Sequence, residues 1–122
     1  MAEKDDCSCQ DHLAEFKPGA LKEQEAVALL PYLDEWLLIE KNGLLALEKT
    51  YKSMGLSAVA RWLLALDEFV QKERHHPDIY LNGQHMQVLW QTKACGGVTG
   101  MDFKMAEYCD SLNLYALADN NS

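Results

Sequence analysis

The sequence predicts an α+β fold in which three helices cover one face of a four-stranded antiparallel sheet, in the order α-β-β-α-β-β-α. A central segment repeats apolar residues at helical spacing, and a pair of strand-like segments joined by a short turn lies on each side of it. The 122-residue chain is 48% hydrophobic and 25% charged, which is typical of one globular domain with a single core.

The two ends of the chain are expected to lie outside this domain. Residues 1–18 are predicted to form an acidic, flexible tail and residues 116–122 a frayed C-terminal tail, so that the domain spans 19–115. Within the domain, good helix formers begin at Leu21, and Pro31 limits how far a helix can extend. The first helix is therefore expected between Leu21 and Pro31.

Two strands are expected next, at 36–40 and 44–52. Asn42-Gly43 between them is the strongest short hairpin signal, because both residues tolerate positive φ. Alternate side chains of the second strand are expected to share one face of the sheet, namely Leu45, Leu47, Lys49 and Tyr51.

A helix over 56–73 is the most regular element, and Pro77 follows just beyond its end. The apolar positions of this helix recur at helical spacing and are expected to be buried: Leu56, Val59, Ala60, Leu63, Leu66 and Val70. Two shorter strands follow at about 78–82 and 85–92, with His85 expected to face solvent.

The last helix is expected at about 100–112, after a Gly-Gly turn at 96–97. Thr99 is a good N-cap residue, and Asp102 puts an acidic side chain in the first turn, where the positive end of the helix dipole favours it. A sheet covered on one face also leaves edges and apolar surface exposed, so we expect a homodimer or homotetramer. The tryptophans expected to anchor the core or that interface are Trp36, Trp62 and Trp90.

The charge balance excludes two classes of partner. Eleven basic against nineteen acidic residues give a formal charge of −8, whereas nucleic acids and anionic membrane surfaces require clustered positive charge. No apolar run approaches the roughly 20 residues of a membrane helix, and the N-terminus does not resemble a secretion signal. A soluble, cytoplasmic protein is expected.

Four cysteines are compatible with two disulfides, but a reducing cytosol favours free thiols at Cys7, Cys9, Cys95 and Cys109. Cys7 and Cys9 with His12 supply three potential metal ligands, one short of the four that a closed zinc site usually needs. We therefore expect no metal site, and interpret this stretch as part of the tail.

Two short motifs carry the candidate chemistry. Residues 75–78, His-His-Pro-Asp, stand at the junction of the central helix and the next strand, and residues 92–99, Thr-Lys-Ala-Cys-Gly-Gly-Val-Thr, precede the last helix. Adjacent imidazoles suit proton transfer near neutral pH, because the ordinary pKa of histidine is about 6.5. Taken alone, the first motif is better explained as a polar surface turn.

With both motifs present, the chain resembles the pterin-4a-carbinolamine dehydratase family over about residues 21–113. Residues 75–78 match its first motif, and the second is matched at unbroken spacing by Thr92, Gly96, Gly97, Thr99 and Asp102. The resemblance implies a pterin pocket in which histidines move protons while hydroxide leaves C4a and a hydrogen leaves N5, without a cofactor. The catalytic residues that it implies are His75, His76, Asp102 and Lys93. The pocket residues that it implies are Pro77, Asp78, Thr92 and Cys95.

Lys93 is the main departure from the family pattern, which has a third histidine at this position. A lysine ordinarily titrates near pH 10.4, far from neutrality, and its longer side chain lacks the two-nitrogen geometry of imidazole. The substitution therefore predicts weak or absent dehydratase activity.

Three functions remain open on this basis. The preferred one is a non-catalytic assembly factor or chaperone, similar to the dehydratase-like proteins that assist RuBisCO assembly in carboxysome-containing organisms. The alternative is an active lyase that dehydrates 4a-hydroxytetrahydrobiopterin with His75 and His76. A third, a dimerisation cofactor of transcription factors like the animal members of the family, gains no support from Asp78-Ile79.

Overall fold

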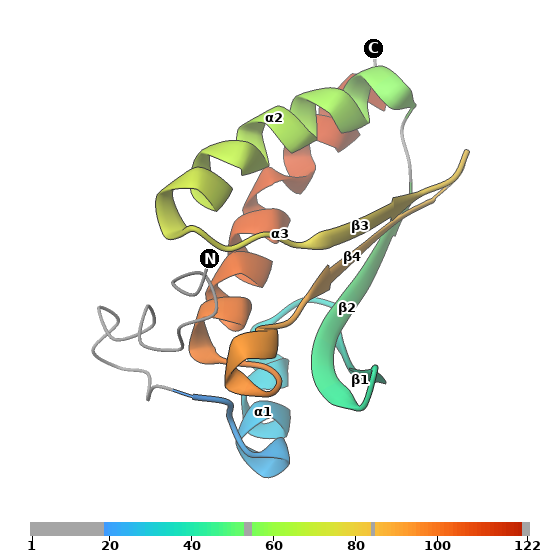
Figure 1. The fold of residues 1–122 in the computed structure, drawn as a ribbon. Coiled ribbons are helices and arrows are strands. Elements are labelled where there is room, and N and C mark those ends of the chain that lie inside the picture. Colours follow the sequence, from blue (N-terminus) through green and yellow to red (C-terminus); the bar gives the residue numbers. More distant parts are fainter. Residues whose placement is uncertain (1–18, 53–54, 84, 121–122) are drawn as a thin grey trace.

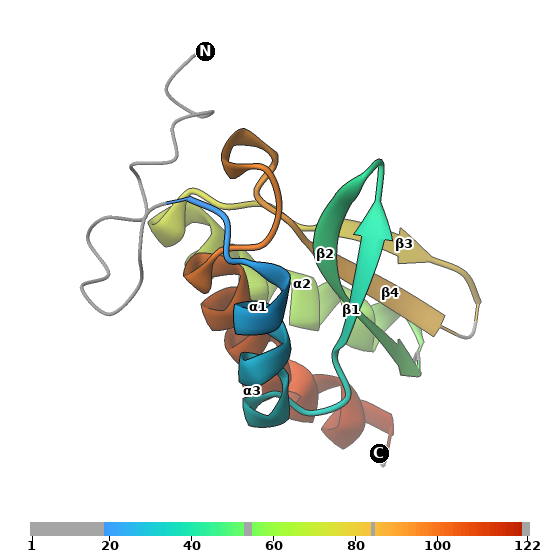
Figure 2. The ribbon, with the colours of Figure 1, turned by 90° about the horizontal axis from the view of Figure 1, so that it is seen from below.

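The computed structural model describes residues 19–52, 55–83 and 85–120, and it confirms the predicted fold class and element order. The elements are α1 (Glu23–Leu29), β1 (Leu37–Lys41), β2 (Leu44–Lys52), α2 (Leu56–Glu73), β3 (Asp78–Leu81), β4 (His85–Trp90) and α3 (Gly100–Asn120). The four strands form one antiparallel sheet in the order β1-β2-β4-β3. The helices lie on one side of it, and α2 packs against α3 (Figures 1 and 2).

The first hairpin turns where the sequence predicts it. Lys41 pairs with Leu44, which leaves Asn42 and Gly43 as the turn residues. Their φ angles are 54° and 82°, a region that Asn and Gly enter at the lowest steric cost. The central pairing of β2 with β4 then places Thr50 opposite Gln87 and completes the link between the two hairpins.

Helix α2 has the predicted bounds, but its buried face is rotated from the predicted one. Its buried residues are Ala58, Val59, Trp62, Leu66, Val70 and Glu73. Leu63 is only half-buried, and the predicted burial of Leu56 and Ala60 is wrong, since Ala60 is exposed and Leu56 is 77% exposed. The large indole of Trp62 lies in the core and sets the contact face, while Leu56 occupies the first, uncovered turn.

The core lies between the sheet and the helices. Trp36, Trp62 and Trp90 are all buried in it, as predicted. Tyr51 joins two of these rings, with centroid distances of 6.4 Å to Trp36 and 5.6 Å to Trp62. Leu47, Lys49 and Tyr51, which were predicted to share one face of β2, are all buried, so this face points to the core.

Asp110 of α3 fastens the helix layer to the sheet. Its carboxylate accepts hydrogen bonds from the Trp36 indole N–H at 3.0 Å, the Lys49 ammonium at 2.8 Å and the Tyr51 hydroxyl at 2.7 Å. Lys49 is buried on the inward face of β2, where an unpaired charge would be costly. The ion pair with Asp110 explains how a lysine is accommodated at a core position.

The last helix begins at Gly100 as predicted but continues to Asn120 instead of ending near 112; beyond Leu112 only its backbone is described. Several predictions fall outside the described residues, namely the acidic tail at 1–18 and the ligand set Cys7, Cys9 and His12. Among the residues that the structure describes, no helix combines the length and the apolar character that a membrane span needs.

Candidate active site

The two sequence motifs meet at one pocket of about 240 Å³. The end of α2, the start of β3, the end of β4 and the turn before α3 all contribute to it. The residues that line it are Arg74, His75, His76, Asp78, Leu89, Gln91, Thr92, Lys93 and Ala94. Five of the eight residues predicted for the site are therefore brought together around one opening, and their chemical roles stay predictions.

His75 is placed by the way α2 ends. Arg74, directly after the last helical residue, has a left-handed φ of 56°, a common conformation at helix C-termini. The backbone N–H of His75 still bonds to the Val70 carbonyl at 3.3 Å, so the chain turns tightly here. The imidazole then packs against the Trp90 ring at a centroid distance of 5.3 Å. The aromatic contact holds the His75 ring between the core and the pocket.

Asp102 is completely buried behind His75, in the first turn of α3. One carboxylate oxygen is hydrogen-bonded to His75 Nε2. The other accepts from the backbone N–H of Thr99 at 2.8 Å and from the hydroxyl of Thr92 at 2.7 Å. The bond to Thr99 is the reciprocal half of a capping box, since Asp102 is the third residue of the helix. Helix capping and histidine positioning thus depend on one carboxylate.

This arrangement selects one tautomer of His75. A carboxylate only accepts hydrogen bonds, so Nε2 of His75 carries the proton that Asp102 binds. Nδ1 is then the nitrogen left for proton exchange. Asp102 is not among the pocket-lining residues; it is bonded to two residues that are, His75 and Thr92.

Four further lining residues lie at the mouth of the pocket and are exposed: Arg74, His76, Asp78 and Lys93. Lys93 opens the short 3-10 turn Lys93–Cys95, and Asp78 lies 3.6 Å from the ammonium of Lys41. The pocket therefore has one deep, fixed imidazole and a polar rim.

Three predicted site residues are not among those that line the pocket: Asp102, Pro77 and Cys95. Pro77 is half-buried beside the histidines, and Cys95 is the last residue of the 3-10 turn. The prediction of a free thiol is wrong for Cys95, which is disulfide-bonded, and correct for Cys109, which is free and buried.

Sequence reasoning missed four lining residues: Arg74, Leu89, Gln91 and Ala94. Gln91 has a clear structural role, since its amide Nε2 donates to the carbonyls of Lys41, Leu44 and Leu45, each at 3.2 Å. It thereby ties the first hairpin to the pocket. Arg74, Gln91 and Ala94 each stand directly beside a motif residue in the sequence, and this was the one signal that could have placed them at the pocket.

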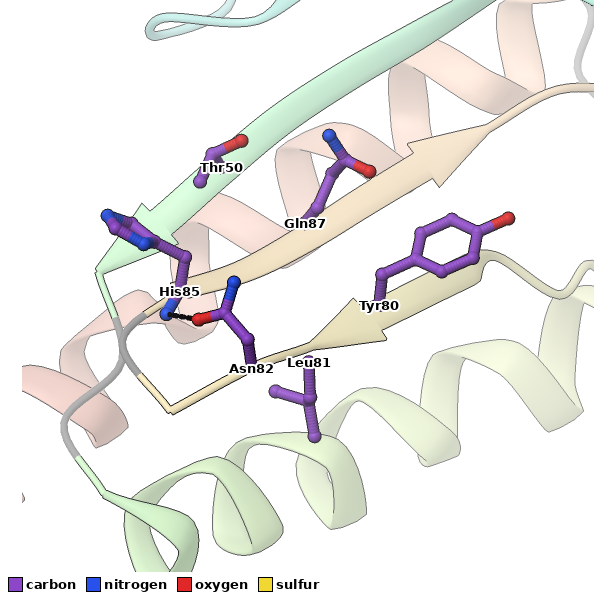
Figure 3. A pocket seen from close by; sticks show the side chains of 6 residues that line it. All are labelled: Thr50, Tyr80, Leu81, Asn82, His85 and Gln87. Carbon is purple, nitrogen blue, oxygen red and sulfur yellow. Dashed lines mark hydrogen bonds between the residues drawn. The ribbon is translucent and has the colours of Figure 1, made fainter.

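A second, larger cavity of about 370 Å³ lies on the other face of the sheet from the helices. Figure 3 shows its lining, which comes from β2, β3, β4 and the turn between the last two: Thr50, Tyr80, Leu81, Asn82, His85 and Gln87. The backbone N–H of His85 donates to the side chain of Asn82 at 2.8 Å. His85 is exposed, as predicted, and it does not line the pocket that the two sequence motifs form, which we call the motif pocket.

No group of three or more His, Cys, Asp or Glu side chains within 19–52, 55–83 and 85–120 is arranged to hold a metal ion. The pocket offers instead one imidazole held by a buried carboxylate, a second imidazole and an amine. This set can accept and donate protons to a small polar ligand.

Comparison with known proteins identifies the family. A family model described as "Pterin 4 alpha carbinolamine dehydratase" matches residues 19–112. A Vibrio cholerae protein named "Putative pterin-4-alpha-carbinolamine dehydratase" is 33% identical over 92 residues, covering 75% of this chain and 84% of the relative. A Microcystis aeruginosa protein of the same name is 30% identical over 112 residues, covering 92% and 95%.

A solved structure supports the same assignment. The transcriptional coactivator/pterin dehydratase of Brucella melitensis matches the fold with a TM-score of 0.68 and 26% sequence identity. The match covers 76% of this chain and 97% of the other. On its sequence and its fold, this chain is a member of the pterin-4a-carbinolamine dehydratase family.

Proposed function

We propose that this chain binds a tetrahydropterin in the motif pocket and dehydrates 4a-hydroxytetrahydrobiopterin slowly. The observation that carries the proposal is His75, whose imidazole is oriented by the buried Asp102 at a pocket that His76 also lines. A positioned imidazole is what general acid–base catalysis requires. This arrangement favours the enzymatic alternative over a purely non-catalytic role.

The reaction needs two proton transfers that balance. The C4a–O bond breaks, and the departing hydroxyl takes a proton from an acid and leaves as water. The N5–H bond gives its proton to a base, and its electrons form the C4a=N5 double bond of the quinonoid dihydropterin. His75, through Nδ1, and His76 are the two imidazoles available for these roles.

Lys93 explains why the reaction is proposed to be slow. It lines the pocket at the position where the family has an imidazole, so one proton-transfer group of the set is replaced by an aliphatic amine. Loss of a general acid or base typically lowers a rate by about 10²–10⁴-fold.

The decisive experiment compares wild type with Lys93→His in a dehydratase assay on a 4a-hydroxytetrahydropterin. We expect a measurable wild-type rate above the uncatalysed one and an increase of at least about tenfold in the variant. His75→Ala should remove the rate in both backgrounds. The proposal fails if the wild type does not accelerate the reaction and Lys93→His does not restore it.

A second function is favoured by a separate surface. On α2, Leu56, Ala60 and Leu64 follow one another at four-residue spacing, and all three are exposed. Such an apolar row is a contact surface for another protein, either a second copy in a homodimer or homotetramer or a client such as RuBisCO. An assembly role predicts that Leu64→Lys abolishes RuBisCO assembly in a reconstitution assay while Lys93→His has no effect on it.

A further inference from the structure

The mouth of the motif pocket carries two cations for which the described part of the chain supplies no partner. Arg74 and Lys93 both line the pocket and both are exposed. Among the described residues, neither side chain takes part in a hydrogen bond or an ion pair. Their charges are therefore available to a ligand.

The acidic groups near the pocket are already engaged. Asp78 lies 3.6 Å from the Lys41 ammonium, and the buried Asp102 is bonded to His75, Thr92 and Thr99. The charge left at the mouth is positive, although the whole chain has a formal charge of −8. This local reversal of sign favours an anionic group at one place on a chain that otherwise repels anions.

The size of the pocket indicates where that anionic group would lie. At about 240 Å³ it is below the roughly 300–1,000 Å³ of pockets that enclose drug-sized ligands. If a bicyclic pterin ring occupies the space beside His75, the small pocket leaves room for its C6 substituent only at the rim. Arg74 and Lys93 are among the groups exposed there.

We infer that this pocket selects pterins whose C6 side chain ends in a phosphate, with Arg74 and Lys93 binding the phosphate. The guanidinium fork matches two phosphate oxygens, and the flexible ammonium adds a point charge. The inference rests on the proposed pterin function and adds the substrate class. On this inference, the change from the family histidine to Lys93 removes an imidazole and adds a group that binds phosphate.

The test uses two ligands with the same ring, 7,8-dihydroneopterin and 7,8-dihydroneopterin 3′-phosphate, titrated into the full chain by calorimetry. We expect the phosphate to bind about tenfold more tightly at low salt, and the ratio of the two affinities to fall as salt screens the charges. Inorganic phosphate alone is the third probe and should compete with the phosphorylated ligand only at much higher concentration.

Variants separate this inference from the proposed function. Arg74→Gln combined with Lys93→Gln should reduce the ratio of the two affinities to about one. Lys72→Gln is the matched control, since Lys72 is an exposed lysine of α2 that does not line the pocket, and it should keep the ratio. Equal wild-type affinities, or an unchanged ratio in the double variant, overturn the phosphate inference alone. If neither pterin binds, both the pterin function and the inference are overturned.

Discussion

At the scale of single residues, Asp102 joins two requirements that are separate in most proteins. Its carboxylate caps α3 through the backbone N–H of Thr99 and holds the ring of His75 through Nε2. The hydroxyl of Thr92 donates a further hydrogen bond to the Asp102 carboxylate at 2.7 Å. Buried carboxylates are tolerated only with such partners, because an unsatisfied one carries the full cost of desolvation.

Asp102→Asn tests this role. With its oxygen accepting from Thr92 and Thr99, the amide turns its N–H₂ group toward His75 Nε2, which then has to accept, so the ring is held in the other tautomer. We expect kcat to fall by about 10²-fold or more, with the affinity for a bound pterin changing much less. Asp110→Asn is the matched control: it also accepts three hydrogen bonds on α3, but it does not line the pocket and should lower stability without lowering kcat.

The buried thiol of Cys109 should make the stability of the protein depend on pH. Burial raises the pKa of its thiol from 9.0 to about 12, and burial likewise raises the pKa of Tyr51 above its usual 10.0. The folded state thus holds protons that the unfolded state releases, so the stabilisation is complete below pH 9 and is lost as the pH rises from about 9 to 12. Each group contributes up to about 1.4 kcal/mol per pH unit in that window.

The measurement is the free energy of unfolding by denaturant between pH 8 and pH 11. Cys109→Ala should show a shallower decline than wild type, whatever its stability at pH 8. Equal slopes in the two proteins would mean that Cys109 does not stay protonated in the folded state.

At the scale of elements, α2 shows how one large side chain fixes the orientation of a helix. The sequence has enough apolar residues for two neighbouring faces, one through Trp62 and one through Leu56 and Ala60. Burying Trp62 removes the largest apolar area from water, so the helix turns this face to the core. The second face is left exposed.

Substitutions two residues apart on α2 should therefore have very different effects on stability. Trp62→Ala is expected to lower the free energy of unfolding by about 3–5 kcal/mol, because it removes a fully buried indole. Leu64→Ala, at a position 72% exposed, should change it by less than about 0.5 kcal/mol. Leu63→Ala should fall between them, and denaturant titration of the three variants checks this order.

At the scale of the whole molecule, the same exposed row predicts self-association. Leu56 and Leu64 are 77% and 72% exposed, which is costly for leucines in water unless another chain covers them. We expect sedimentation to give a dimer or tetramer at micromolar concentration, and Leu56→Lys with Leu64→Lys to give the 13.8 kDa monomer. A wild type that sediments as a monomer would contradict this prediction and leave the row as a surface for a different protein.

The sequence by itself determined the element order, the first hairpin and the two motifs. These depend on neighbours along the chain: Asn42-Gly43 supplies its own turn geometry, and the period of 56–73 is helical whatever lies beside it. Five of the eight residues assigned to the site also meet at one pocket, because the motifs stand at element ends that the fold brings together.

Tertiary structure alone decided which face of α2 is buried, that Asp102 is hydrogen-bonded to His75, and that Arg74 and Lys93 share a rim. His75 and Asp102 are 27 positions apart, so no local pattern encodes their contact. Which apolar face of α2 is buried depends on the total area that it buries against β2, β4 and α3. Whether a basic side chain stays unpaired depends on whether the acidic side chains near it already bind residues of other elements. Such quantities belong to the packed molecule, since they arise from contacts between segments that are distant in sequence.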